Sequence, residues 1–307
     1  MATDRRLVSA EVLQQMRKPD ELTSMQTRAF ATMAVLASSA LLFGADGTLA
    51  RAPHDGVGRA AGRRLVFSDG FSGPAGTAPS SADWSFDTGG GGWGNNELEC
   101  YTSNPGNASL DGQGHLAITA KRETYASRTA SCAYTSARMK TQGTFSTTYG
   151  RIEARIRLPA GRGLWPAFWA LGDDIESAGW PGSGEIDVME SLGDDPSTVY
   201  GSIHGPQAGQ ARGYGISSAY HAATSLADGF HTYRVSWSPS ALVFSVDGQA
   251  YAKRTPAQLS GAQRWVFNKP FFLMLNLAVG GSWPGSPDAA TRFPATMLVD
   301  WVRVYSR

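Results

Sequence analysis

The chain of 307 residues carries a formal net charge of +1, and only 17% of its residues are charged. That balance excludes the concentrated positive charge of proteins that bind nucleic acid or anionic membranes. Its 36 glycines and 9 tryptophans are typical of a turn-rich β protein that binds an uncharged ligand on aromatic side chains.

The N-terminal 60 residues differ from the rest of the chain. An apolar run over residues 29–43 follows Arg28, and small residues around Ala50 come next, a pattern typical of a secretory signal. About 15 apolar residues are too few to span a membrane comfortably. We therefore predict an extension and signal peptide over 1–52, a linker over 53–62 and one folded domain over 63–307. The mature protein is then secreted or periplasmic, with no membrane attachment.

The polar residues 1–24 are too many for the basic start of a signal, so the sequence favours Met25 as the functional start. An uncleaved amphipathic anchor is the alternative. The two cysteines, Cys100 and Cys132, suit a disulfide closing a loop of roughly 30 residues in an exported protein, and two buried free thiols are the other interpretation.

Apolar and polar residues alternate along the predicted domain, which indicates β-strands. The clearest example is 150–159, where every second residue from Ile152 to Leu158 is apolar. Further strands are predicted over 230–237, 242–246, 271–279 and 296–305. Asp247-Gly248 indicates a hairpin turn after the second of these. No amphipathic helical pattern follows residue 60, so the sequence favours an all-β sandwich.

The most informative segment is Gly184–Ser191, which contains three acids. On a regular strand Glu185 and Asp187 point to one face and Glu190 points to the other. One extra residue in a β-bulge returns Glu190 to the face of the other two acids, and we predict that Met189 is this inserted residue. Three acids on one face raise one another's pKa, which is a cost that indicates chemistry or metal binding.

Glycoside hydrolysis needs such a set, because one carboxylate attacks the anomeric carbon while another keeps a proton for the leaving oxygen. A retaining enzyme holds the two about 5–5.5 Å apart, so the bulge must shorten the span between Glu185 and Glu190. Trp165 and Trp169 lie upstream, and Trp180 lies just before the motif. Because sugar rings stack on tryptophan, these neighbours favour a carbohydrate cleft over acids that only face water.

With these motifs in order, the chain resembles glycoside hydrolase family 16, and specifically its bacterial laminarinase-like endo-1,3-β-glucanases. The resemblance runs from Leu65 to Tyr305 and rests on eight stretches in the expected order. They are Phe67–Phe71, Trp93–Glu99, Ser136–Arg138, Gly163–Trp169, Gly184–Glu190, Ile203–Gly205, Leu275–Gly281 and Asp300–Tyr305. The resemblance implies a jelly-roll sandwich of two curved antiparallel sheets (concanavalin-like), with the glucan in a concave cleft. We expect a monomer.

By position in the motif, the resemblance implies that Glu185 is the nucleophile and Glu190 the acid/base. Asp187 would hydrogen-bond the nucleophile and tune its ionisation. The reaction would be the retaining endo-hydrolysis of β-1,3-glucan through a covalent glycosyl-enzyme intermediate. Seven more residues match substrate contacts: Asn96 and Arg138 on the glycone side, Trp165 and Trp169 as stacking walls, His204 near Glu190, Asn276 in an apolar strand, and Trp283 in the loop that follows.

The resemblance requires no cofactor. Some members carry a structural calcium on the convex side, bound by an aspartate near the C-terminal strand, and Asp300 occupies that place. This chain has Asp69-Gly70 where the common pattern is Asp-Glu. If the second residue contributes only its carbonyl, Gly70 serves equally, and if its side chain is needed, the site is weaker. Any calcium here would be structural and not catalytic.

Several alternatives stay open at this point. Galactan-cleaving relatives such as agarases and carrageenases share the bulged acid motif, although sulfated substrates would favour more basic residues. A mixed-linkage glucanase or a transglycosylase would keep the same fold. A glucan-binding lectin is the non-enzyme alternative, against which all three acids are present. The last alternative is a metal site formed by the acids, although no His or Cys cluster accompanies them.

Overall fold

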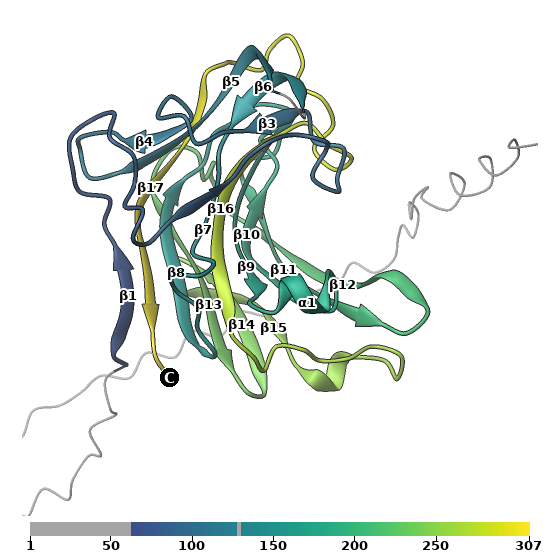
Figure 1. The fold of residues 1–307 in the computed structure, drawn as a ribbon. Coiled ribbons are helices and arrows are strands. Elements are labelled where there is room, and N and C mark those ends of the chain that lie inside the picture. Colours follow the sequence, from purple (N-terminus) through teal and green to yellow (C-terminus); the bar gives the residue numbers. More distant parts are fainter. Residues whose placement is uncertain (1–62, 128–129) are drawn as a thin grey trace, which may run out of the picture. The chain divides into compact units, whose positions relative to one another are not determined.

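The computed structural model describes residues 63–127 and 130–307. The predicted signal peptide, the Met25 start and the linker therefore lie outside the described residues. Two curved β-sheets pack face to face in the described part (Figure 1), which confirms the predicted sandwich.

The larger sheet has ten strands. They are β1 (Leu65–Asp69), β3 (Glu99–Tyr101), β4 (Ala108–Leu110), β5 (Leu116–Ala126), β6 (Ser131–Ser136), β8 (Gly150–Arg157), β13 (His231–Ser238), β14 (Ala241–Val246), β15 (Gln249–Arg254) and β17 (Ala295–Tyr305). Their order is β15-β14-β13-β8-β17-β5-β6-β3, with β1 paired to β17 and β4 to β5. Every pair is antiparallel except β3 with β6, which is parallel.

The smaller sheet has seven strands. They are β2 (Ser85–Asp87), β7 (Arg138–Lys140), β9 (Leu164–Gly172), β10 (Glu185–Ser191), β11 (Thr198–Gln207), β12 (Gln210–His221) and β16 (Phe271–Val279). Their order is β12-β11-β10-β9-β16-β7-β2. This arrangement places β10, with its acids, inside the sheet between β9 and β11.

The alternating patterns of the sequence form the strands that they predict. Ile152, Ala154 and Ile156 of β8 are fully buried, and all nine residues of β16 are buried. Asp247 and Gly248 both have positive φ (48° and 84°) and join β14 to β15, as a two-residue hairpin turn requires. The helices of the described residues are short, α1 (Ile175–Ala178) and the 3₁₀ turn η2 (Pro256–Gln258), and none of them has the length and apolar character needed to cross a membrane.

Apolar side chains from the two sheets meet between them and form the core. Ile156 and Phe244 come from the larger sheet, Phe168 and Leu275 from the smaller one, and each is fully buried. Burial of this apolar surface is the main term that holds the sheets together, at about 25 cal/mol per Å². One face of the smaller sheet therefore packs in the core, and the opposite, concave face is available to form a binding site.

Cys100 and Cys132 form a disulfide with their Cα atoms 5.6 Å apart, which confirms the first of the two interpretations. The bond lies against the glycine-rich segment 89–94. A Cβ atom on Gly90 would come within 2.9 Å of both sulfur atoms, so a side chain there would clash. The disulfide therefore supports the backbone that carries Trp93.

Candidate active site

A bulge in β10 brings the three acids to the concave face. Opposite β9, Asp187 pairs with Trp169 and Met189 pairs with Phe168, so Val188 has no partner. Val188 and Met189 are both buried in the core, because a bulge turns two consecutive side chains to one side. The predicted bulge is thus confirmed; opposite β9 the unpaired residue is Val188 and not Met189, and opposite β11 neither residue is paired. Glu190 lines the same cleft as Glu185 and Asp187.

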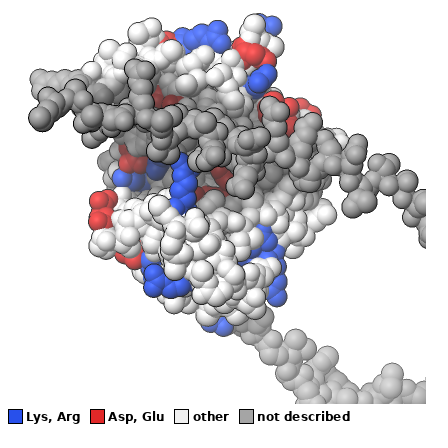
Figure 2. Space-filling view, turned by 90° about the vertical axis from the view of Figure 1, so that its right-hand side faces the viewer, with Lys and Arg blue, Asp and Glu red and all other residues white. Residues whose placement is uncertain are grey.

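The cleft on the concave face has a volume of about 980 Å³. Tryptophans supply much of its lining: Trp93, Trp165, Trp169, Trp180 and Trp283. Arg138 of β7 lines it at one side of the sheet and Ser217 of β12 at the other, so it crosses the strands. On the face that Figure 2 shows, Lys, Arg, Asp and Glu are scattered over the visible described surface.

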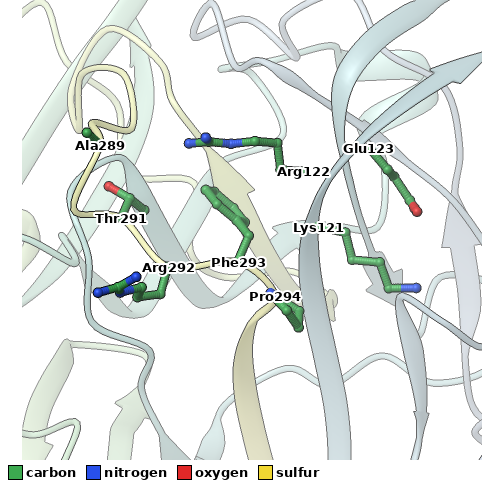
Figure 3. Close-up of a pocket in the computed structure, with 8 residues that line it drawn as sticks. All are labelled: Lys121, Arg122, Glu123, Ala289, Thr291, Arg292, Phe293 and Pro294. Atoms are coloured by element: carbon green, nitrogen blue, oxygen red, sulfur yellow. The ribbon is translucent and has the colours of Figure 1, made fainter.

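A second hollow of about 500 Å³ lies between β5 and residues 289–294 (Figure 3). Its lining includes Lys121, Arg122 and Arg292, and the Arg122 guanidinium lies over the ring of Phe293, 5.2 Å from its centroid. None of the predicted site residues lines this hollow. The concave cleft is therefore the candidate active site.

Glu185, Asp187 and His204 form an ion-pair network at the centre of the cleft. His204 of β11 pairs in register with Glu185 of β10. Its Nε2 atom lies 3.2 Å from Asp187 Oδ2 and 3.9 Å from Glu185 Oε1. The Trp180 indole donates to Glu185 Oε2 at 3.1 Å. The Glu185 carboxylate therefore has hydrogen-bonding and charged neighbours on more than one side.

Glu190 lies against aromatic neighbours. The Trp165 indole of β9 donates to Glu190 Oε1 at 3.1 Å. Trp283 packs edge-on against both Trp165 and Tyr200, with centroid distances of 5.3 and 4.9 Å. These rings form a continuous aromatic wall beside Glu190.

The two glutamates titrate far from their ordinary range. Burial, followed by the charge of Asp187, raises the pKa of Glu185 to about 8, although His204 and Trp180 act in the opposite direction. Burial, followed by the charges of Asp187 and Glu185, raises the pKa of Glu190 well above its ordinary value. Because the charge of Glu185 acts on Glu190, Glu190 keeps its proton after Glu185 has lost its own. A retaining enzyme requires this order of deprotonation, and a pKa of about 8 means that Glu185 in the empty cleft ionises mainly above neutral pH.

His204 carries a positive charge at neutral pH. Burial alone lowers the pKa of its imidazole, but the hydrogen bond to Asp187 and the charges of Asp187, Glu185 and Glu190 together raise it to about 9. A protonated imidazole has no lone pair for a metal ion. One ligand atom from each of Glu185, Asp187 and His204 lies within 4.8 Å of the others, so a metal ion at this point would have to displace the imidazole proton.

Arg138 is held firmly at one side of the cleft. Its guanidinium lies between the rings of Trp93 and Trp169, at 5.1 and 4.8 Å from their centroids. Its Nε atom is 3.0 Å from Asp87 Oδ2. Stacking and ion pairing together fix the orientation of this side chain, in the position that the sequence predicts for a substrate contact.

Asn276, the polar residue of the apolar strand β16, finds the partners that its burial demands. Its Oδ1 accepts from the Trp169 indole at 2.7 Å, and its Nδ2 donates to the hydroxyl of Tyr101 at 3.1 Å. Tyr101 in turn donates to Glu97 Oε2 at 3.1 Å. The chain of hydrogen bonds fixes the Trp169 ring and brings Glu97 to the cleft.

Two predicted contacts lie elsewhere than expected. Asn96 does not line the cleft, because its backbone has positive φ (59°) and its amide donates to Ser282 Oγ at 2.8 Å. The neighbouring Asn95 and Glu97 line it instead. His204 lines the cleft but has its closest acidic contacts with Asp187 and Glu185 and not with Glu190.

Several cleft residues were not singled out from the sequence. Trp93 and Glu97 belong to the stretch Trp93–Glu99, in which several residues could contact a sugar and the sequence does not distinguish among them. Trp180, five positions before Glu185, was named from the sequence as a sign of a carbohydrate cleft but was given no contact of its own. Arg212 and Ser217 lie on β12 without a motif, and sequence gave no means of finding them.

Asp300 of β17 is the residue expected to bind a structural calcium, and its Oδ2 atom forms an ion pair with Arg155 Nη1. Asp69, beside the position that departs from the common pattern, has both carboxylate oxygens engaged, one by the backbone N–H of Phe71 at 2.8 Å and one by the Trp84 indole at 2.9 Å. Calcium needs six to eight oxygen ligands, and the Arg155 cation competes with such an ion for the Asp300 carboxylate.

A tryptophan-lined cleft across a β-sandwich, with a charge-coupled pair of glutamates at its centre, defines a glycoside hydrolase. Residues 95–303 match the family model described as Glycosyl hydrolases family 16. The chain belongs to that family.

Known proteins agree with this membership. A beta-glucanase of Rhodothermus marinus is 38% identical over 295 residues, which are 93% of this chain and 96% of that protein. The laminarinase catalytic domain of Thermotoga maritima is 43% identical, with a TM-score of 0.74 over 80% of this chain and 98% of that one. An endo-beta-1,3-glucanase of Pyrococcus furiosus is also 43% identical, with a TM-score of 0.74 over 80% and 94%.

Proposed function

We propose that the protein is a retaining endo-1,3-β-glucanase in which Glu185 is the nucleophile, Glu190 the acid/base and Asp187 the residue that orients Glu185. The observation that carries this proposal is the bulge of β10, which gathers the three acids in a tryptophan-lined cleft. The similarity to a laminarinase domain and an endo-1,3-glucanase supports β-1,3-glucan as the substrate.

In the first step the Glu185 carboxylate attacks the anomeric carbon of the bound glucan. The bond from that carbon to the glycosidic oxygen breaks, and the proton of Glu190 passes to the departing oxygen. The raised pKa of Glu190 keeps this proton available at neutral pH. The product of the step is a glycosyl ester on Glu185 and a shortened glucan chain.

In the second step a water molecule takes the place of the departed chain. Glu190, now ionised, removes a proton from the water, whose oxygen attacks the anomeric carbon and releases Glu185 as a carboxylate. Two inversions restore the β-configuration. His204 Nε2 lies 3.2 Å from Asp187 Oδ2 and 3.9 Å from Glu185 Oε1, so its positive charge lies beside both carboxylates.

The remaining cleft residues bind the sugar. The wall of Trp165, Trp283 and Tyr200 beside Glu190 offers apolar ring faces to glucose units. At the other side of the cleft, Trp169 offers a further ring face, and the Arg138 guanidinium donates hydrogen bonds to sugar hydroxyl groups. The cleft is open across the sheet, from Arg138 to Ser217, and an open cleft accepts a polymer in the middle of its length, as endo cleavage requires.

The proposal is tested by following the anomeric configuration of products by proton NMR. Wild-type protein and a Glu185→Ser variant would be incubated with laminarin, mixed-linkage glucan and agarose. We expect the β-anomer to appear first from laminarin and no product from the variant. An α-anomer as first product would overturn the retaining mechanism.

The same assay separates the competing functions. Cleavage of agarose alone would assign the protein to the galactan-cleaving members, and cleavage of mixed-linkage glucan alone would assign it to the mixed-linkage glucanases. Laminarin that is bound but never cut would make the protein a lectin. Turnover that stops on chelation while the fold stays intact would revive a metal site.

We also propose that the protein is exported and acts as a monomer. The disulfide of Cys100 and Cys132 supports an oxidising compartment, and the apolar run at 29–43 supports a signal. Sequencing the N-terminus of protein recovered outside the cytoplasm should give a start near residue 52. A start at residue 1 or 25 in mature protein would contradict export by this signal, and a dimer mass in light scattering would contradict the monomer.

A further inference from the structure

The two proposed catalytic glutamates each accept one hydrogen bond from a different tryptophan. Trp180 donates to Glu185 Oε2 and Trp165 donates to Glu190 Oε1, both at 3.1 Å. The indole N–H is a neutral donor that does not titrate and cannot accept. Each carboxylate therefore has a hydrogen-bond donor that stays the same at every pH, whereas His204 and the other glutamate change their charge as they titrate.

The two donors are held in position by separate parts of the fold. Trp165 is a residue of β9, inside the smaller sheet. Trp180 lies between α1 and β10 and is 45% exposed. Its segment is anchored outside the cleft by Lys269, whose Nζ is 2.6 Å from Asp174 Oδ2 and donates to the carbonyl of Gly182 at 3.3 Å.

Packing on the other side of the segment restricts it further. A Cβ atom on Gly213 of β12 would lie 2.6 Å from Pro181 Cγ, so β12 approaches the residue after Trp180 closely. Anchors on both sides leave the indole little freedom to turn away from Glu185.

We propose that Trp180 and Trp165 are positioning residues: Trp180 orients the Glu185 carboxylate and stabilises its charged form, and Trp165 does the same for Glu190. This inference rests on the proposed roles of the two glutamates. It gives each tryptophan a task in the chemical step that is separate from the stacking of sugar rings.

The charges around each carboxylate show why such a donor matters. Asp187 of β10 disfavours ionisation of Glu185, whereas His204 of β11 and Arg138 of β7 favour it. The hydrogen bond from Trp180 acts in the same direction as these two cations. It opposes burial and the charge of Asp187, because a hydrogen bond to the charged form lowers the pKa of an acid.

Glu190 is surrounded by more negative charge. Asp187 and Glu185 raise its pKa, whereas His204 and the Trp165 hydrogen bond lower it. Tyr251 of β15 lies close enough to feel the charge of Glu190. Loss of the Trp165 donor should therefore raise the pKa of Glu190 and leave Glu185 with its own donor intact.

The test is the pH dependence of kcat/KM on laminarin for Trp180→Phe and Trp165→Phe, since this profile reports the ionisations of the free enzyme. We expect Trp180→Phe to move the acid limb upward by about one pH unit, with activity recovering above it. Trp165→Phe should instead move the alkaline limb upward. Both changes keep an aromatic ring, so stacking is largely retained.

Trp283→Phe is the matched control, because no carboxylate of the described residues accepts a hydrogen bond from Trp283. It should raise KM while both limbs stay in place. Lys269→Met removes the anchor without touching the cleft and should shift the acid limb in the same direction as Trp180→Phe. A wild-type enzyme that cuts laminarin while both phenylalanine variants keep its limbs would overturn the inference; a wild type without activity would overturn the proposed function instead.

Discussion

The two faces of the smaller sheet differ in the residues that they bury and in how that burial affects stability. The face toward the larger sheet is wholly apolar around the site, with Ile186, Val188 and Phe168 buried in the core. The concave face carries Asp187 and Asn276, which are also buried, at 3% and 7% exposed. Burial of apolar groups stabilises the fold, whereas burial of interacting acids costs free energy. The core face therefore stabilises the fold, whereas the buried acids of the concave face lower its stability and serve the reaction.

The largest expected effect is on catalysis at the concave face. Glu185→Ser should lower kcat on laminarin by at least about 10⁴-fold, because no other carboxylate takes the place of the nucleophile. The same variant should melt no lower than the wild type at pH 7, since a buried acid is removed. Assay and thermal unfolding on one preparation measure both. A variant that loses activity by unfolding would contradict the division between the two faces.

On the core face the expected effect is on stability. Phe168→Ala should lower the free energy of unfolding by about 3–5 kcal/mol, because it leaves a cavity in a fully packed region. Trp283→Ala, also an aromatic truncation, should change stability by less than about 1 kcal/mol, since Trp283 is 42% exposed, and should raise KM. Chemical denaturation measures the free energy of unfolding of the two variants. Equal destabilisation by both substitutions would contradict the proposed difference between the two faces.

The disulfide behind the segment that carries Trp93 should contribute less than the core. Cys100→Ser together with Cys132→Ser should cost about 3–4 kcal/mol, given a separation of 32 residues and the loop-entropy model. Activity at low temperature should survive, because the acids on β10 do not contact the disulfide. Denaturant midpoints with and without reductant provide the measurement. A midpoint unaffected by reductant and by the substitutions would show that the bond contributes nothing to stability.

The most gradual expected effect is a loss of stability as pH rises. The folded pKa of Glu185 is about 8 against an ordinary 4.5, and that of His204 is about 9 against 6.5. In both cases the folded state holds the proton more tightly, so the stabilisation is complete below the ordinary pKa and is lost as pH rises through the folded one. Asp111 and Asp195, whose pKa values are lowered, change the stability of the fold only at more acidic pH.

Melting temperatures between pH 5 and pH 9 test this expectation. The wild type should melt progressively lower across the range, and Glu185→Gln should reduce the slope because one of the groups with a raised pKa no longer titrates. A melting temperature that rises with pH would show that the concave face does not hold its protons as described.

The sequence predicts the core face well because its signal is repeated. The alternation in β8 and the unbroken apolar run of β16 each involve many residues, so the strand and its buried face follow from the period of two. Asn276 stood out in the same way, as a single polar residue in an apolar strand whose burial required partners. The order of motifs then led to the family and to the acids.

Predictions for the concave face failed where one backbone angle decides the outcome. Asn96 and Asn95 have the same side chain, and the positive φ of Asn96 directs it to Ser282 and away from the cleft. The choice between Val188 and Met189 in the bulge depends on the pairing with β9, to which both apolar residues are equally suited. Away from the concave face, the ion pair of Asp300 with Arg155 also could not be predicted, because it joins two strands that are distant in sequence.

The central claim is that Glu185 is the nucleophile and that the bulge of β10 brings Glu190 to the same face as its acid/base. It is tested most directly by incubating the protein with a 2-deoxy-2-fluoro laminaribioside bearing a good leaving group, which lets the glycosyl ester form but slows its hydrolysis. Proteolysis and mass spectrometry then locate the label. We predict one glycosyl group per chain on Glu185. A label on Glu190 or Asp187, or none at all under conditions where laminarin is cut, would contradict the account.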